Sequence, residues 1–186
     1  MPKIVDHDER RRELAQAALT VIGRSGLEAA TIRAVAEESG WSTGVLKHYY
    51  ADKDALLRAT LREMERANMA RFDAAQQQPN AFDAIAAIVT EILAADAAEA
   101  RLWIAFTARA STDPEIAGLM RHAIDVWVTR WAALVRRGQS DGSIRADLDA
   151  EQVAGEIHAL VNGLRLRHQF RPTPGNPVLL EHLRTR

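Results

Sequence analysis

The chain of 186 residues contains no cysteine and no long apolar run. Without cysteine, a disulfide framework, a thiol nucleophile and a zinc–thiolate site are excluded, which is compatible with a reducing compartment. No apolar run approaches the ~20 residues of a membrane span, and the start MPKIVDHDERRR lacks the apolar core of a signal peptide. We therefore expect a cytoplasmic protein with no membrane partner.

A surplus of positive charge is also missing. The formal net charge is -1, so the chain as a whole lacks the basic excess that announces a nucleic-acid partner. Hydrophobic residues make up 47% of the chain, which excludes a disordered protein and supplies a core for one large or two small domains. If the protein binds DNA, the positions of its charges must account for it, because their sum does not.

One stretch, TIRAVAEESGWSTGVLKHYYADK, predicts two short helices around a tight turn. Ile32, Val35 and Ala36 follow helical spacing, and Thr31 stands before them in the N-cap position. Gly40 then supplies the left-handed backbone that a sharp turn requires. These signals define a first helix that is closed at both ends.

A second helix begins after Ser42 or Thr43, either of which can cap it, and it turns Leu46 toward the core. The spacing of Ala36, Gly40 and Leu46 is that of a helix-turn-helix. Such a motif needs a small residue where the helices cross, a glycine in the turn and an aliphatic residue on the second helix. The same spacing also suits a helical hairpin without a DNA-binding function.

With Leu46 turned inward, the opposite face of the second helix is polar and basic. Small residues at a helix start allow close approach to the sugar-phosphate backbone, and free amide groups there attract phosphate. Arg33, on the preceding helix, is the best candidate for reading a base, because its guanidinium matches a guanine edge. The other residues expected at DNA are Ser42, Thr43, Gly44, Lys47, His48 and, opening the next helix, Lys53.

The stretch GWSTGVLKHYYADKDALL resembles the DNA-binding domain of the TetR family of bacterial transcriptional regulators. The matching features are a threonine-led helix, a glycine turn, Ser-x-Gly, an aromatic pair and a lysine that opens the fourth helix. In this sequence they are Thr31, Gly40, Ser42, Gly44, Tyr49, Tyr50 and Lys53.

The resemblance implies which side chains contact DNA. The implied residues are Thr31, Arg33, Ser42, Thr43, Gly44, Lys47, Tyr49 and Lys53. Two positions depart from the family pattern. Trp41 stands where a smaller aliphatic residue is usual, and Lys47 stands where a tyrosine is common, which makes a contact there more ionic.

Apolar residues recur at helical spacing along the rest of the chain, and no segment predicts a strand. We therefore expect an all-α protein of about nine helices, with a three-helix helix-turn-helix domain at 1–53 and a helical bundle for ligand sensing and dimerisation at 54–186. The second part resembles the same family, and most closely its betaine-pathway repressor subgroup, on Trp103 and the run Asn162-Gly163-Leu164. The expected helices beyond the motif cover 8–24, 54–78, 82–92, residues around 102–106, 114 to just before Gly138, a segment after Asp149, and a short tail helix at 178–183.

Aromatic residues are few, at 5% of the chain, yet three of the four tryptophans gather in the second half. They could line an apolar pocket for a small-molecule effector, or fill the core of a helical bundle. No cofactor or metal is expected. The candidate effector-binding residues are Trp103, Phe106, Arg109, Met120, Trp127, Trp131 and Asn162.

Gly155, Ala159 and Gly163 form a stripe of small residues on the last long helix. Two glycines inside a helix cost about 1 kcal/mol each relative to alanine, so a close helix contact is a reasonable explanation. We hypothesise that this face forms a homodimer, and two-fold symmetry also matches a palindromic DNA site.

These observations predict a ligand-responsive, homodimeric DNA-binding regulator, a repressor that a small-molecule effector releases from a palindromic operator. Two alternatives are an activator of the same fold and a helical protein-interaction module without DNA binding. An enzyme is not expected, because the sequence has no HExxH motif, no glycine-rich phosphate loop and no cysteine nucleophile.

Overall fold

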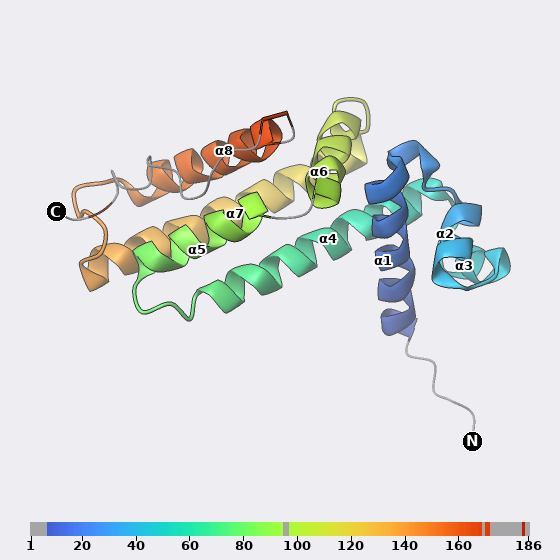
Figure 1. Cartoon of the computed structure of the whole chain (residues 1–186), viewed down its shortest axis with the longest axis horizontal. Coiled ribbons are helices and arrows are strands. Elements are labelled where there is room, and N and C mark those ends of the chain that lie inside the picture. Colours follow the sequence, from blue (N-terminus) through green and yellow to red (C-terminus); the bar gives the residue numbers. More distant parts are fainter. Residues whose placement is uncertain (1–6, 95–96, 169, 172–183, 185–186) are drawn as a thin grey trace, which may run out of the picture. The chain divides into compact units, whose positions relative to one another are not determined.

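The computed structural model describes residues 7–94, 97–168, 170–171 and 184, and within these ranges the chain is helical, with one isolated bridge between Ile144 and Arg184. The all-α prediction is confirmed (Figure 1). The expected tail helix at 178–183 lies outside the described residues. The elements are α1 (His7–Ser25), the 3-10 turn η1 (Leu27–Ala29), α2 (Ile32–Ser39), α3 (Thr43–Tyr49), α4 (Lys53–Ala75), α5 (Ala81–Ala94), α6 (Ala97–Ala110), α7 (Pro114–Asp141) and α8 (Ala150–His168).

The contacts between residues divide the chain into two compact units. The first unit contains α1, η1, α2, α3, the part of α4 up to Ala67, α6 and the start of α7 up to Met120. The second unit contains the rest of α4 from Asn68, α5, α7 from Arg121 and α8. Helices α4 and α7 therefore contribute residues to both units.

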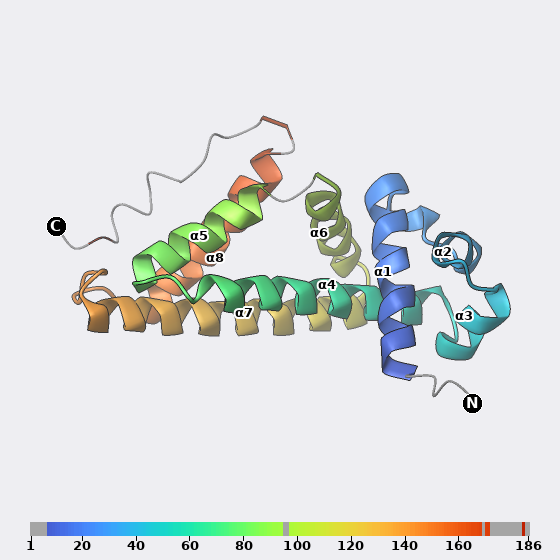
Figure 2. The same cartoon turned by 60° about the horizontal axis from the view of Figure 1, so that its bottom comes forward.

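In the first unit, α1 packs against α2 and α6, and α2 packs against α3 (Figure 2). The stripe that the sequence placed on α1 is buried, with Leu14 and Ala18 fully excluded from solvent. Leu46 of α3 and Phe106 of α6 are fully buried in the same cluster. Burying an aliphatic or aromatic side chain of this size contributes about 1.5–3 kcal/mol, so this core holds the helix-turn-helix in place.

In the second unit, α5 packs against α8, and the aromatic residues of α7 complete the core. Ile85 and Val89 of α5 and Trp131 of α7 have no exposed surface. The start of α5 is capped by the end of α7, because the Ala81 amide donates to the Asp141 carboxylate at 2.9 Å.

Two helix ends differ from their predicted positions. Helix α4 stops at Ala75 rather than near residue 78. The guanidinium of Arg137 donates hydrogen bonds to the backbone carbonyls of Gln76 and Gln78 that follow, each at 2.9 Å. Helix α7 continues through Gly138 to Asp141, so the expected end before Gly138 is wrong.

Acidic residues cap the starts of α7 and α8. The Asp113 carboxylate accepts from the amides of Glu115 and Ile116 at 3.1 and 3.2 Å, and these bonds, with that from Ile116 first, lower the pKa of Asp113. Asp149 accepts from the amide of Gln152 at 2.7 Å. None of the helices in the described part of the chain is both long and apolar enough to cross a membrane.

Candidate nucleic-acid interface

The turn between α2 and α3 has the geometry that the sequence predicts. The Thr31 hydroxyl accepts from the Ala34 amide at 3.1 Å and caps α2. Gly40 takes the left-handed conformation, with φ 72° and ψ 11°, and the next amide, that of Trp41, donates back to the Ala36 carbonyl at 3.0 Å. This hydrogen-bonded reversal ends α2 and turns the chain sharply into α3.

Helix α3 is fixed by one cap and one buried side chain. The Ser42 hydroxyl accepts from the Val45 amide at 3.3 Å, so Ser42 rather than Thr43 is the cap. Leu46 is fully buried, and the small Ala36 of α2 is buried beside it in the same cluster. The crossing of the two helices therefore follows the spacing that the helix-turn-helix prediction used.

The outward face of α3 is polar and open to solvent. Ser42, Thr43, Gly44, Lys47 and His48 are exposed, and Tyr49 is half-buried. Within the described residues neither Arg33 nor Lys47 has an ion-pair partner. Two exposed cations without carboxylate partners are suited to phosphates and base edges.

Lys53 is positioned differently. Its ammonium donates to the Glu28 carboxylate at 2.8 Å and to the Glu28 carbonyl at 3.2 Å. The hydrogen bond from Lys53, and then its charge, lower the pKa of Glu28. Lys53 therefore ties α4 to η1, and a contact between Lys53 and DNA would have to replace this ion pair.

The two tyrosines of the aromatic pair have separate roles. Tyr50 is buried, and its hydroxyl donates to the Arg11 carbonyl of α1 at 2.9 Å. Burial raises the pKa of Tyr50, which keeps it neutral as an anchor for the end of α3. Tyr49 instead faces the N-terminal end of α1, where its hydroxyl forms a hydrogen bond of 3.0 Å with Nδ1 of His7.

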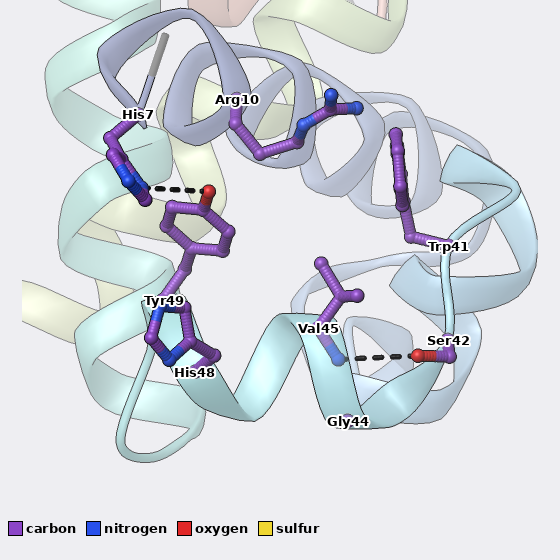
Figure 3. Close-up of a pocket in the computed structure, with 8 residues that line it drawn as sticks. All are labelled: His7, Arg10, Trp41, Ser42, Gly44, Val45, His48 and Tyr49. Carbon is purple, nitrogen blue, oxygen red and sulfur yellow. Dashed lines mark hydrogen bonds between the residues drawn. The ribbon is translucent and has the colours of Figure 1, made fainter. Parts of the chain in front are cut away.

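Between α1 and α3 lies an open hollow of about 560 Å³ (Figure 3). The guanidinium of Arg10 lies over the ring of Trp41, 3.6 Å from its centroid. Sequence reasoning did not include His7 or Trp41 in the site, because no local motif connects the start of α1 with the turn. The hollow is lined by His7, Arg10, Trp41, Ser42, Gly44, Val45, His48 and Tyr49.

The predicted effector-binding residues fall into both units. In the first unit, Phe106 and Met120 are core residues, Trp103 packs against the same core, and Arg109 forms ion pairs with Asp54 and Asp113. Trp127, Trp131 and Asn162 belong to the second unit. For all seven candidate residues, a role in binding an effector stays a prediction.

In the second unit, Trp127 and Trp131 form an aromatic cluster with Phe72 of α4. The ring centroids of the two tryptophans are 5.8 Å apart, and Phe72 lies edge-on at 5.6 Å from Trp127 and 5.3 Å from Trp131. Sequence reasoning missed Phe72, although its helical register with other buried residues of α4 could have identified it as an inward-facing position. A small hollow of about 10 Å³ borders this cluster, lined by Asn68, Arg71, Phe72, Ile88, Glu91, Ile92 and Trp127.

His158 lies at the edge of the aromatic cluster, 6.4 Å from Trp127 between ring centroids. Its Nε2 and the Asn162 amide nitrogen are 3.0 Å apart. With the Asn162 NH₂ as donor, Nε2 of a neutral His158 ring accepts this hydrogen bond. Burial lowers the pKa of His158, which favours the same neutral form.

The small-residue stripe of α8 is open in the single chain. Gly155 is half-buried, whereas Ala159 and Gly163 are exposed. A Cβ atom added to either glycine would meet nothing within 4 Å among the described residues. The chain itself therefore gives no packing reason for glycine at these positions.

The turn, the caps and the exposed basic face define a helix-turn-helix protein of the DNA-binding class, and comparison with known proteins identifies its family. The model described as "Bacterial regulatory proteins, tetR family" matches residues 14–60, and the model described as "BetI-type transcriptional repressor, C-terminal" matches residues 81–185. The chain belongs to the TetR family of transcriptional regulators, with a C-terminal part of the BetI type. It is therefore a DNA-binding regulator and not an enzyme.

Individual relatives agree with this family. The HTH-type transcriptional regulator BetI of Vibrio atlanticus is 32% identical over 184 residues, which cover 92% of this chain and 86% of the relative. The regulator PksA of Bacillus subtilis is 28% identical over 192 residues, covering 98% and 92%. The resemblance to the betaine-pathway subgroup is thus confirmed.

Solved structures show the same fold. A TetR-family regulator from Rhodococcus sp. superposes with a TM-score of 0.77 at 24% identity and covers 90% of each chain. A regulator from Saccharomonospora viridis, solved in complex with choline, superposes with a TM-score of 0.74 at 24% identity and covers 95% of this chain and 92% of its own.

Proposed function

We propose that the protein is a homodimeric repressor that leaves a palindromic operator when a small cationic effector binds. In this proposal residues 1–53 read DNA, and residues 54–186 bind the effector and form the dimer. The observation that carries the proposal is the outward face of α3, where Lys47, together with Arg33 of α2, is exposed without an ion-pair partner among the described residues.

The DNA contacts of this proposal use the predicted set. Ser42 and Gly44 allow the start of α3 to approach the backbone closely, and Lys47 meets a phosphate one turn later. Thr31, Thr43, His48 and Tyr49 border the same surface and would position the protein on the duplex. Arg33 is the residue proposed to read a base, and Lys53 would contact the backbone after exchanging its ion pair with Glu28.

The open stripe on α8 supports a homodimer. Gly155, Ala159 and Gly163 leave room for the backbone of a second helix, and the next residue on this face, Leu166, is 42% exposed. Small residues flanked by an exposed aliphatic side chain suit close packing of two copies. Two recognition helices would then enter successive major grooves, about 34–36 Å apart or a multiple of this spacing.

The dimer is tested by sedimentation equilibrium. Gly163→Leu fills the open stripe and should lower the fraction of dimer, whereas Ala74→Leu, at an exposed position of α4, should leave it unchanged. A wild-type protein that sediments as a monomer at micromolar concentration contradicts the dimer. So does a Gly163→Leu variant as dimeric as the wild type.

The aromatic cluster of the second unit supports a cationic effector. The faces of Trp127 and Phe72 can stabilise a quaternary ammonium group, and the carboxylate of Glu91 lines the adjacent hollow. The choline complex of the regulator from Saccharomonospora viridis supports the same class of ligand. The hollow of about 10 Å³ is too small for such a ligand and has to widen. The effector would therefore bind more tightly to a conformation in which the side chains that line the hollow have moved apart.

Such a preference would link the effector to DNA binding. Helix α4 begins at Lys53, directly after the recognition helix, and carries Phe72 near its end. A rearrangement around Phe72 that changes the separation of the two recognition helices would weaken binding to a fixed palindrome. A coupling of about 1–3 kcal/mol corresponds to roughly 5–150-fold lower DNA affinity.

The full proposal is tested by selecting random duplex DNA with the purified protein. We expect a palindromic sequence whose binding weakens steeply with salt and weakens again when choline is added. Trp127→Leu should remove the response to choline, and Ala74→Leu, at an exposed position of α4, should retain it. Tighter DNA binding with choline would make the protein a ligand-recruited regulator, and a missing response would reject choline as the effector while leaving the DNA-binding result intact.

A further inference from the structure

We propose that the hollow between α1 and α3 holds one sugar-phosphate unit of the DNA backbone beside each half-site, with His7 and His48 as its cationic ligands. This inference rests on the proposed DNA-binding function and extends its surface onto α1. It has a measurable consequence, because a contact made by histidines gains strength as the solution becomes more acidic.

The position of the hollow identifies DNA as its occupant. Ser42, Gly44, His48 and Tyr49 form one wall and belong to the surface already proposed to meet DNA. Val45 belongs to the same helix and points into the hollow, and the opposite wall comes from His7 and Arg10 of α1, with Trp41 of the turn at one end. A backbone that lies along the start of α3 would therefore pass over the opening of the hollow (Figure 3).

The lining of the hollow matches the two chemical parts of a backbone unit. Trp41 and Val45 offer apolar surface for a deoxyribose ring, and the imidazoles of His7 and His48 lie 6.5 Å apart between centroids. Ring nitrogens at this separation can donate to different oxygens of one phosphate. Deoxyribose and phosphate together need this combination of an apolar wall and cationic donors.

The two arginines of α1 beside the hollow already have carboxylate partners. Glu13 accepts from Arg10 at 2.8 Å and holds it against Trp41. Arg11, whose guanidinium lies 5.9 Å from the Tyr49 ring, is paired with Asp8 at 3.5 Å. His7 and His48 have no carboxylate partner in the part of the chain that the structure describes.

Tyr49 connects the protonation of His7 to the phosphate. When His7 is neutral with Nδ1 unprotonated, the Tyr49 hydroxyl donates its proton to this nitrogen across 3.0 Å. When His7 is protonated, Nδ1–H donates to the Tyr49 oxygen instead, and the Tyr49 hydroxyl proton becomes free for a phosphate oxygen. Protonation of one imidazole therefore adds a charge and also frees a neutral donor.

The test compares the salt dependence of DNA binding at about pH 6 and about pH 8, on either side of the range in which histidine titrates. The probe is a fluorescein-labelled duplex of the sequence that the full-length protein enriches from random DNA, and ionic strength is matched at both pH values. For the wild type we expect a slope of log affinity against log salt that is steeper at pH 6 by up to about 1.8, since a dimer would neutralise two more phosphates. The double variant His7→Gln/His48→Gln should lose this difference, whereas His122→Gln, which removes an exposed histidine of α7, should keep it.

A second readout locates the phosphate. Ethylation of single phosphates should interfere with wild-type binding at one backbone position per half-site that becomes tolerant in the double variant. Each single variant should retain part of the pH difference, which keeps the test available if the double variant folds poorly. A double variant with the pH difference and the ethylation pattern of the wild type overturns the inference. If the wild type enriches no sequence, the proposed function fails together with the inference; if it binds a palindrome with the same slope at both pH values, the inference alone fails.

Discussion

Lys47 offers the most direct measurement of how the recognition helix meets DNA. It is exposed on α3, and it forms no ion pair within the described residues. Lys47→Ala removes one cation, leaves the buried Leu46 in place and introduces a residue with high helix propensity. The substitution therefore changes the charge of the surface without a reason for α3 to unfold.

The size of the effect follows from counterion release. Each phosphate that a protein neutralises contributes about 0.9 to the slope of log affinity against log salt. The proposed homodimer carries two copies of Lys47, so the slope should fall by about 1.8. Between roughly 50 and 200 mM salt, a fourfold change, the ratio of wild-type to variant affinity should then shrink by about 12-fold.

Fluorescence anisotropy of the selected duplex over this salt range measures the slope directly. Arg145→Ala is the matched control, since Arg145 is also an exposed cation but is paired with Asp147 at 2.5 Å in the second unit. The control should leave the slope of the wild type unchanged. A Lys47→Ala slope parallel to that of the wild type would refute the contact, and a fall of about 0.9 would mean that only one Lys47 of the complex meets a phosphate.

Three further substitutions test the role of Arg33, the ion pair of Lys53 and the burial of His158. Arg33→Ala should relax specificity at one base pair of each half-site by about 1–3 kcal/mol in competition with single-base variants; a uniform loss on all sequences would assign Arg33 to the backbone instead. Glu28→Gln should release Lys53 and steepen the salt slope, and an unchanged slope would show that Lys53 does not reach DNA. His158 has its pKa lowered by burial, so the unfolded chain binds a proton first and stability should fall as the pH drops below about 6.5; His158→Gln should flatten this part of the urea-midpoint profile, and His122→Gln should not.

The helix-turn-helix was predictable because its determinants are local. Thr31 and Ser42 each cap the helix that follows within three residues, and Gly40 makes its turn through its own backbone angle. The hollow beside it was not predictable from such signals. Arg10 and Trp41 come together only when α1 packs against the motif, and helical periodicity does not specify which residues meet across two helices.

The candidate effector-binding residues also show that helical periodicity does not specify which side chains meet. Trp103 and Trp127 are both tryptophans in apolar helical stripes, so the sequence analysis placed both among the candidate effector-binding residues. The structure assigns them to different compact units, and it adds Phe72 and His158 to the neighbours of Trp127. Periodicity identifies an inward-facing side chain, whereas the neighbours that it meets depend on the packing of helices distant in sequence.

Glycines inside helices illustrate why packing must be seen before such residues are interpreted. Gly138 was expected to end α7, yet its helix continues, its carbonyl accepts from the Ile144 amide at 2.9 Å, and a Cβ there would lie 2.5 Å from Ile144 Cδ1. Gly155 and Gly163 carry a similar helix-propensity cost of about 1 kcal/mol each, but a Cβ on either would meet nothing within 4 Å among the described residues. The fold of the single chain explains glycine at Gly138 and not at Gly155 or Gly163, which favours α8 over α7 as the contact face of the proposed homodimer.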